Sequence, residues 1–294
     1  MEAKPVYLPK RILEKKLLGF LKEDVGQGDI TTYLIIPTNT KAEAEVIAKE
    51  AGIVAGIEEA IVLCKSCGIE AEALTEDGVE VRPEMAIMRL LGDARNILSL
   101  ERTLLNLLSR MSGIATATKR LVRRIRDTGY KTRVAGTRKV GPGLSYFDKK
   151  AVFLGNGDTH RLHLDDLVLI KDNHIKIVGS VERAIKESRN VVSFSKKVEV
   201  EVASAEEALQ AAKAGADIVM LDNFSPHKIK QTISLLEKEK VRTGVVLEAS
   251  GGITEKSILE YVSTGVDIVS IGAITHSVKA LNISLEVVKV EKGE

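Results

Sequence analysis

From about residue 130 onward, short runs rich in valine and isoleucine alternate with helical patterns, and this alternation strongly constrains the fold. The runs are Arg133–Ala135, Leu167–Ile170, Val198–Val202, Ile218–Leu221, Val245–Leu247 and Ile268–Ile271. Helical patterns such as Ser204–Ala214 and Thr254–Thr264 lie between several of them. Buried strands separated by helices are typical of repeated β-α units with a parallel sheet. Residues 113–277 are therefore predicted to form an α/β domain.

Six such strands could form either a doubly wound sheet or a small α/β barrel. No Gly-x-Gly-x-x-Gly motif follows the first strand. The dinucleotide-binding fingerprint of many doubly wound sheets is therefore missing. We favour the barrel.

The first part of the chain has a mixed pattern instead. Apolar residues from Ile12 to Leu21 recur with helical spacing, and Asp29 is a candidate helix cap. Alternation from Ala42 to Ala48 predicts a half-buried strand, and a long helix is expected from about Ala94. Residues 1–112 are predicted to form a smaller α+β domain, on which residues 278–294 also pack.

Composition restricts the function classes. Of the 294 residues, 44% are hydrophobic and 29% charged, as in globular proteins, and the net charge of +2 gives no general attraction to nucleic acid. No apolar run approaches the roughly 20 residues of a membrane span, and the N-terminus lacks a signal-peptide core. A cytoplasmic enzyme is expected. The only cysteines, Cys64 and Cys67, lack a second pair to complete a zinc site, so we interpret them as small residues near a helix end.

The strand ends carry most of the candidate functional residues. In a parallel α/β fold, chemistry gathers at the carboxyl ends of the strands. A cationic set consists of Arg138, Lys139, His160, Arg161 and Lys171. Such a set suits a small dianion, because arginine presents paired donors to a carboxylate or phosphate.

Two further sets complete the strand ends. Glu201 and Asp222 can accept hydrogen bonds from sugar hydroxyls or hold Mg²⁺ through oxygen atoms. Ser250, Gly251, Gly252 and Gly272 let backbone N–H groups approach a phosphate, with a helix N-terminus expected to follow. Each signal alone also fits an ordinary solvated surface, and His160-x-x-His163 lacks the spacing of a helical metal-binding pair. Their occurrence together, in strand order, points to a binding site.

Motifs along nearly the whole chain resemble the quinolinate phosphoribosyltransferase family, or carboxylating nicotinate-nucleotide pyrophosphorylase. They are Glu23–Thr32, Glu101–Asn106, Ser112–Thr116, Gly136–Leu144, Thr159–Leu162, Val168–His174, Val198–Val202, Asp217–Asn223 and Glu248–Ile253. The resemblance implies an incomplete α/β barrel of the type II phosphoribosyltransferase kind, with a smaller N-terminal α+β open-faced sandwich domain.

The resemblance also implies an activity. Members condense quinolinate with phosphoribosyl pyrophosphate, using Mg²⁺, to give nicotinate mononucleotide, pyrophosphate and CO₂ in de novo NAD synthesis. They are homodimers with a shared active site, and a larger assembly of the hexamer-of-dimers type is also allowed. No nucleic-acid or membrane partner is expected.

The implied site follows the same sets. Quinolinate would contact Arg102, Arg138, Lys139, His160, Arg161 and Lys171, with Arg102 supplied by the partner subunit. The phosphoribosyl group would contact Glu201, Asp222, Ser250, Gly251, Gly252 and Gly272. Lys139, Lys171, Glu201 and Asp222 would be catalytic, and Glu201 and Asp222 would hold the metal. On the helix that carries Arg102, the residues Asn106, Ser109 and Gly113 continue a polar or small stripe, which is also the pattern of a plain solvent-facing surface.

The sequence departs from the family pattern beside the acceptor site, at Gly136, Val140, Ser145 and Asp158. Losing a potential cation at 145 and gaining an anion at 158 would weaken a dicarboxylate pocket if both side chains point inward. Three hypotheses follow: the decarboxylating quinolinate enzyme, a related phosphoribosyltransferase for another acid such as nicotinate, and a non-catalytic sensor of phosphoribosyl compounds.

Overall fold

The computed structural model describes residues 7–291, which fall into two compact units. The first unit contains the chain up to Lys119, the segment Pro142–Asn156 and the C-terminal segment from Val278. The second unit contains Arg120–Gly141 and Gly157–Ser277. The division at Lys119 falls inside one continuous helix, α4 (Ala94–Arg126), whereas the sequence analysis divided the chain at residue 112.

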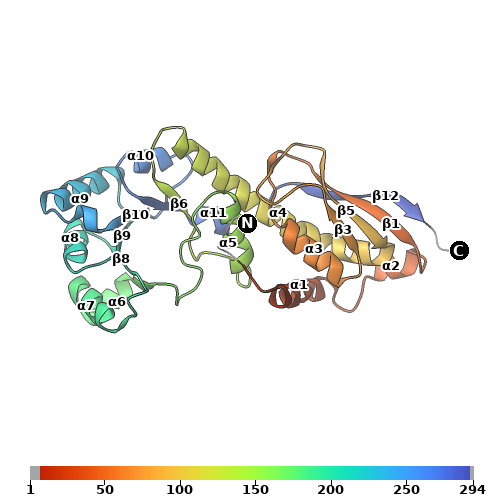
Figure 1. The fold of residues 1–294 in the computed structure, drawn as a ribbon, viewed down its shortest axis with the longest axis horizontal. Coiled ribbons are helices and arrows are strands. Elements are labelled where there is room, and N and C mark those ends of the chain that lie inside the picture. Colours follow the sequence, from red (N-terminus) through yellow and green to blue (C-terminus); the bar gives the residue numbers. More distant parts are fainter. Residues whose placement is uncertain (1–6, 292–294) are drawn as a thin grey trace. The chain divides into compact units, whose positions relative to one another are not determined.

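The first unit is built on a four-stranded antiparallel sheet in the order β12-β1-β5-β3 (Figure 1). The strands of this sheet are β1 (Lys41–Ala48), β3 (Glu70–Ala73), β5 (Met85–Asp93) and β12 (Ile283–Glu291). The first unit also contains the short strands β2 (Gly52–Ile53) and β4 (Glu80–Val81), which pair with each other. Its helices are α1 (Lys10–Val25), α2 (Ile30–Ile35), α3 (Ile57–Ser66), α5 (Ser145–Leu154) and the first part of α4. The Asp29 carboxylate accepts from the Thr32 N–H at 3.0 Å, which confirms the predicted cap. The C-terminal strand β12 pairs with β1.

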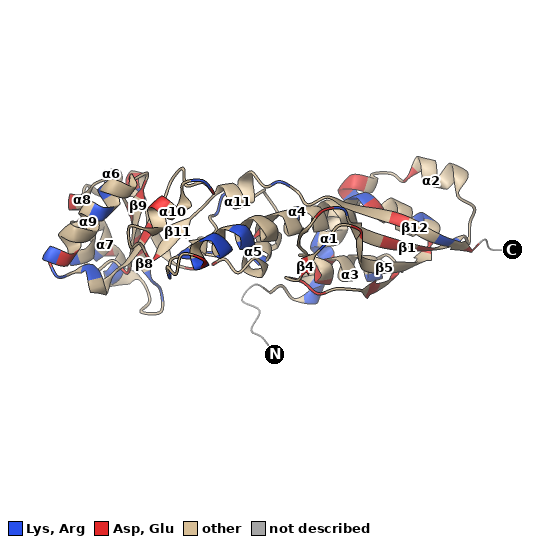
Figure 2. Cartoon of the chain, turned by 90° about the horizontal axis from the view of Figure 1, so that it is seen from above, with Lys and Arg blue, Asp and Glu red and all other residues tan. Residues whose placement is uncertain are grey.

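Buried charges explain why α5 belongs to the first unit. The Lys150 ammonium lies 2.6 Å from a Glu58 carboxylate oxygen and 2.8 Å from one of Glu59. Arg110 on α4 donates two hydrogen bonds to the buried carboxylate of Asp148, at 2.8 and 2.7 Å. Figure 2 marks the basic residues of α5 in blue. The sequence analysis placed residues 142–156 within the barrel domain, whereas these contacts join α5 to the first unit.

Replacing Lys150 by methionine should lower the free energy of unfolding by about 3–5 kcal/mol, because it leaves buried carboxylates unpaired. Lys176→Met removes an exposed pair with Asp172 on α6 and should cost less than about 0.5 kcal/mol. Urea denaturation of both variants measures the difference. Equal losses would show that the Lys150 cluster contributes no more than a surface pair.

The second unit holds a six-stranded parallel sheet in the order β6-β11-β10-β9-β8-β7. Its strands are β6 (Arg133–Ala135), β7 (Val168–Ile170), β8 (Val198–Val202), β9 (Ile218–Asp222), β10 (Val246–Ser250) and β11 (Ile268–Ser270). The helices are α6 (Asp172–Val178), α7 (Val181–Val191), α8 (Ala205–Lys213), α9 (Pro226–Lys238), α10 (Ile258–Val262) and α11 (Ala273–His276), with a 3₁₀ turn at Arg242–Gly244. Among the described residues the two edge strands do not pair with each other, so the barrel is incomplete, as predicted (Figure 1).

Two aspartates fix the register of this sheet at the strand beginnings. Asp217 accepts from the Val198 N–H at 2.6 Å, and Asp267 accepts from the Leu247 N–H at 2.8 Å. Each follows a glycine with positive φ, Gly215 or Gly265, at the turn from helix to strand. Because the strand beginnings are tied to their neighbours, the carboxyl ends of the strands meet at one edge.

Two other sequence-based expectations concern cysteines and membranes. Cys64 and Cys67 lie at the end of α3, and burial raises the pKa of Cys64 to about 12, so its thiol stays protonated. Between residues 7 and 291, no helix has the length and apolarity that crossing a bilayer requires.

Candidate active site

The carboxyl ends of the strands in the second unit surround a cavity of about 510 Å³. All three predicted sets contribute to its lining: the cations, the two acids and the Ser250–Gly252 loop. Of the predicted residues, only Arg102 and Gly272 are not part of the lining. A second cavity of about 560 Å³ shares Arg138, Arg161 and Lys171 with the first.

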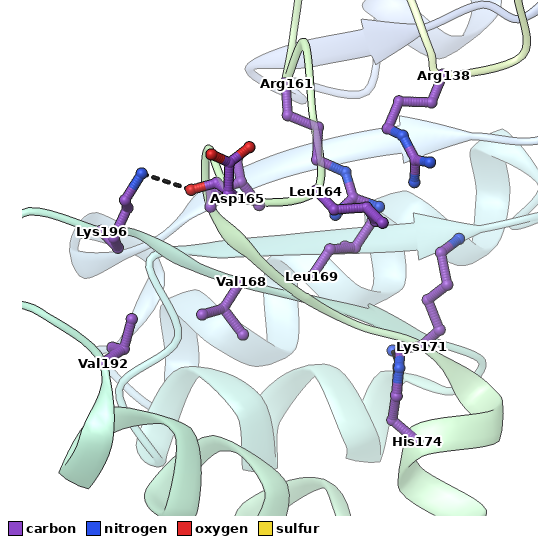
Figure 3. Close-up of a pocket in the computed structure, with 11 residues that line it drawn as sticks. Arg138, Arg161, Leu164, Asp165, Val168, Leu169, Lys171, His174, Val192 and Lys196 are labelled. Atoms are coloured by element: carbon purple, nitrogen blue, oxygen red, sulfur yellow. Dashed lines mark hydrogen bonds between the residues drawn. The ribbon is translucent and has the colours of Figure 1, made fainter.

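The three shared cations come from separate segments and extend toward one another (Figure 3). Leu164 and Leu169 give the second cavity an apolar side. Arg161 is buried, and its burial together with the nearby charge of Arg138 lowers its pKa. Gathering like charges in a concave site is costly unless an anion binds there. The arrangement therefore favours a small, flat polyanion with an apolar face.

His160 lies beneath these cations in an unusual backbone conformation, with φ of 53°. Its N–H donates to the Asp158 carboxylate at 2.8 Å, and its ring Nδ1 accepts from the Arg161 N–H at 2.7 Å. Ring Nε2 lies 3.1 Å from Glu248 and 3.4 Å from Glu199. A non-glycine residue with positive φ persists only where its surroundings fix it, and this is frequent at functional sites.

Burial alone would lower the pKa of His160, but the contacts with Glu199 and Glu248 outweigh burial and raise the pKa to about 10. Burial also raises the pKa of Glu199. Since Nδ1 accepts a hydrogen bond, Nε2 carries the ring proton. Both shifts favour a proton at the contact between the His160 ring and the Glu199 carboxyl group.

The acidic set lies on neighbouring strands. Glu201 on β8 pairs with the Lys171 ammonium at 2.6 Å, and Asp222 ends β9 with its carboxylate accepting from the Asn223 side chain at 2.8 Å. The His174 ring accepts from the Lys171 N–H at 2.9 Å and so caps α6 beside this pair. Both carboxylates line the cavity. They can therefore accept from hydroxyl groups or bind a cation there.

The Ser250–Gly252 loop follows β10 directly. Gly251 has φ of 98° and Gly252 has φ of 61°, a region open to glycine. A Cβ atom on Gly251 would lie 2.2 Å from the side-chain oxygen of Asn223. The expected helix N-terminus is absent next to the loop, because α10 begins only at Ile258 and α11 is four residues long. Backbone N–H groups, rather than a helix dipole, are what this loop offers a phosphate.

Lys139 is held by the turn that contains Gly272. The Thr275 hydroxyl donates to the Lys139 carbonyl at 2.8 Å. A Cβ atom on Gly272 would lie 3.1 Å from the Lys139 side chain. Gly272 is therefore a close-approach position beside a lining residue.

Arg102 lies on α4 in the first unit with 64% of its side chain exposed. The stripe to which it belongs is only partly a free surface. The backbone carbonyl of Ser109 accepts from the Leu281 N–H at 2.9 Å, and a Cβ atom on Gly113 would lie 2.3 Å from the Lys279 carbonyl. Its second half therefore serves packing, and only Arg102 and Asn106 stay exposed.

Asp158, one of the departures from the family pattern, does not line the cavity. One Asp158 oxygen accepts from the His160 N–H and the other lies 3.1 Å from Arg133. Ser145 begins α5 in the first unit. Asp158 thus supports the loop that carries His160, and the weakened pocket considered from the sequence is not what the structure has.

The sequence analysis did not predict the contacts of Glu199 and Glu248 with His160. Burial and barrel geometry bring these two glutamates to the His160 ring. The alternation Val198-Glu-Val-Glu-Val202 was the available signal, because it places Glu199 on the same face as Glu201. His163 is not part of this cluster, and the nearby Asp166 caps the backbone N–H groups of Leu162 and His163.

Comparison with known proteins assigns the family. The model of the quinolinate phosphoribosyl transferase N-terminal domain matches residues 29–112, and that of the C-terminal domain matches residues 114–286. A probable carboxylating nicotinate-nucleotide pyrophosphorylase of Methanocaldococcus jannaschii is 47% identical over 96% of this chain and 98% of that protein. The Rattus norvegicus carboxylating nicotinate-nucleotide pyrophosphorylase is 37% identical over 95% of this chain and 92% of that protein.

A solved structure agrees with these matches. The nicotinate-nucleotide pyrophosphorylase from Francisella tularensis superposes with a TM-score of 0.88 at 38% identity, covering 98% of this chain and 100% of the other. Sequence and fold therefore agree. This chain belongs to the quinolinate phosphoribosyltransferase family.

Proposed function

We propose that this chain transfers the phosphoribosyl group of phosphoribosyl pyrophosphate to quinolinate, with loss of CO₂, to form nicotinate mononucleotide and pyrophosphate. The observation that carries the proposal is the cavity of the second unit, where cations, two carboxylates and a glycine loop lie together. This combination suits a flat dicarboxylate beside a phosphorylated sugar. A cytoplasmic enzyme of NAD synthesis fits this chemistry.

The acceptor would occupy the cationic side of the cavity. Quinolinate carries two adjacent carboxylates on a flat ring, and Arg138, Arg161 and Lys171 offer donors to both. The apolar side formed by Leu164 and Leu169 suits the ring face. His160 and Lys139 complete this side of the cavity.

The phosphoribosyl group would occupy the opposite side. Ser250, Gly251 and Gly252 would bind the 5′-phosphate through backbone and hydroxyl donors. Gly272 would contribute to this side as the close-approach position next to the Lys139 side chain. Glu201 and Asp222 would accept from the ribose hydroxyls. These two carboxylates, on adjacent strands and open to the cavity, also fit Mg²⁺, which proteins hold through one or two carboxylates together with substrate phosphates. Bound Mg²⁺ would neutralise charge on the pyrophosphate.

The residues support a dissociative displacement without a protein nucleophile. The quinolinate nitrogen bonds to the anomeric carbon as the bond from that carbon to the pyrophosphate oxygen breaks, and Lys139 stabilises the departing charge. Glu201 and Asp222 lie where positive charge develops on the ribose ring. Once the ring nitrogen is cationic, the bond to the neighbouring carboxylate breaks, CO₂ leaves, and the electron pair left on the ring carbon takes a proton.

A second copy of the chain would supply Arg102 to this site, in a homodimer with shared active sites. The exposed side chain of Arg102, with only the adjacent Glu101 as a recorded ion-pair partner in the described chain, supports this. Sedimentation analysis of the purified protein tests the dimer, and a monomer with full activity would contradict it.

The activity is tested by supplying the protein with phosphoribosyl pyrophosphate, Mg²⁺ and carboxyl-labelled quinolinate or nicotinate, while CO₂ and mononucleotide are both measured. Equal amounts of CO₂ and nicotinate mononucleotide from quinolinate are expected. Product from nicotinate alone would assign a different acceptor. Binding of phosphoribosyl pyrophosphate without any product would favour the hypothesis of a non-catalytic sensor of phosphoribosyl compounds.

Arg138→Ala should raise the KM for quinolinate at least about tenfold, since a hydrogen bond to a charged group contributes about 1.5 kcal/mol or more. The KM for phosphoribosyl pyrophosphate should change less than about twofold, the range expected of substitutions outside its site. Arg183→Ala, which removes an exposed arginine on α7, is the matched control. Similar losses for both substrates would contradict the assignment of Arg138 to the acceptor.

A further inference from the structure

Two fully buried glutamates lie beneath the cationic side of the cavity. Glu199 is on β8 and Glu248 on β10, and one Oε2 atom of each lies within 3.4 Å of His160 Nε2. Both oxygens of Glu199 and the Oε1 atom of Glu248 lack a hydrogen-bond partner among the residues that the structure describes. Buried carboxylates without full hydrogen bonding destabilise a fold, so their presence calls for a reason other than folding.

His160 connects these carboxylates to the acceptor side. While Nε2 faces Glu199 and Glu248, Nδ1 accepts from the Arg161 N–H at 2.7 Å. Asp158 holds the His160 N–H from the other side, at 2.8 Å. Ring and backbone of His160 are thus fixed at three points, and the contact from Nδ1 to the Arg161 N–H fixes where the Arg161 side chain begins.

The charges around Arg161 also connect the buried glutamates to the acceptor side. Arg138 disfavours the charge on Arg161, whereas Glu199 favours it. Glu199 therefore helps to keep two guanidinium groups close together before an anionic ligand arrives. Neither glutamate is needed to touch that ligand.

We infer that Glu199 and Glu248 are positioning residues that hold the His160 ring, and through it Arg161, in place to bind a carboxylate of the acceptor. The inference rests on the proposed function for the identity of that acceptor. It makes two buried strand residues, of which Glu248 also lines the cavity, part of the specificity for an aromatic dicarboxylate.

The test combines Glu199→Gln and Glu248→Gln, each alone and with Arg161→Ala. Each glutamine variant should raise the KM for quinolinate about tenfold and leave that for phosphoribosyl pyrophosphate within about twofold, because the lost contact acts on one subsite. Added to Arg161→Ala, each should change the quinolinate KM by less than about twofold, since the pathway through Arg161 is already lost. The midpoint of urea unfolding should not fall, because a buried charge is removed.

Glu59→Gln is the matched control, since Glu59 is equally buried but pairs with Lys150 in the first unit. It should lower stability and leave the ratio of the two KM values unchanged. Asp158→Ala alters the same contacts of His160 from outside the core, and it should raise the quinolinate KM even if the core variants fold poorly.

Three results would overturn the inference. They are equal rises in both KM values, full additivity with Arg161→Ala, and a stoichiometric transition metal that both glutamine variants lose. The last would make His160, Glu199 and Glu248 a metal site, since their ligand atoms lie within 4.8 Å of one another. If the unaltered protein makes no product from quinolinate, the proposed function fails separately. Crystal structures of the unaltered protein and Glu248→Gln then decide, and an unmoved His160 ring and Arg161 would contradict the inference.

Discussion

Replacing Glu201 by glutamine is expected to lower kcat by about 10²–10³, the loss seen when one preorganised electrostatic group is removed from a transition state. The carboxylate of Glu201 faces the cavity from β8 and pairs with Lys171 at 2.6 Å. When substrates bind, Lys171 can turn to the acceptor carboxylate and leave Glu201 for the ribose or Mg²⁺. Glutamine keeps the size of the side chain but not the negative charge that opposes an oxocarbenium-like state.

Steady-state kinetics with both substrates measures this effect. Glu187→Gln on α7 removes an exposed carboxylate paired with Arg183 and should leave kcat unchanged. If Glu201→Gln raised both KM values and kept kcat, Glu201 would bind the ground state and the transition state equally. The electrostatic role proposed for it would then be wrong.

The strands of the barrel could be predicted because fully buried parallel strands form continuous apolar runs. All six predicted runs are strands; two coincide with the observed bounds, and the ends of the others differ by at most three residues. Because the candidate residues were chosen at the carboxyl ends of these strands, most of the predicted cations, acids and glycines line the cavity. Order along the chain was enough for this part, because a parallel sheet brings every strand end to one edge.

Tertiary burial of charge could not be predicted. Asp148, Lys149 and Lys150 are adjacent charged residues that look solvent-exposed, yet all three are buried. Asp148 pairs with Arg110 and Lys150 with Glu59, and each partner lies more than 30 residues away along the chain. The same limit applies to Glu248, whose contact with His160 depends on strand orientation and on the positive φ of a single loop residue.

Gly251→Ala is expected to abolish most phosphoribosyl binding, raising the KM for phosphoribosyl pyrophosphate at least about tenfold, the equivalent of about 1.4 kcal/mol. The new Cβ atom would lie 2.2 Å from Asn223 Oδ1, 2.6 Å from its Cγ and 2.9 Å from its backbone nitrogen, at a φ of 98°. Asn223 is itself at positive φ and its N–H is bonded to the Ser250 carbonyl at 2.8 Å. It cannot move without breaking the loop.

Gly252→Ala separates this clash from a general effect on the loop. Gly252 also has positive φ, at 61°, but a Cβ atom there would meet nothing within 4 Å. Gly252→Ala should lower the free energy of unfolding only by the strain of a left-handed alanine, about 1 kcal/mol, whereas Gly251→Ala should lower it by about 2–4 kcal/mol.

Urea unfolding and the KM for each substrate measure both variants. Because the clash lies on the phosphoribosyl side, the KM for quinolinate should respond less than that for phosphoribosyl pyrophosphate. Equal behaviour of the two alanine variants would mean that the loop adapts, and that close approach of the Gly251 backbone is not what binds the phosphate.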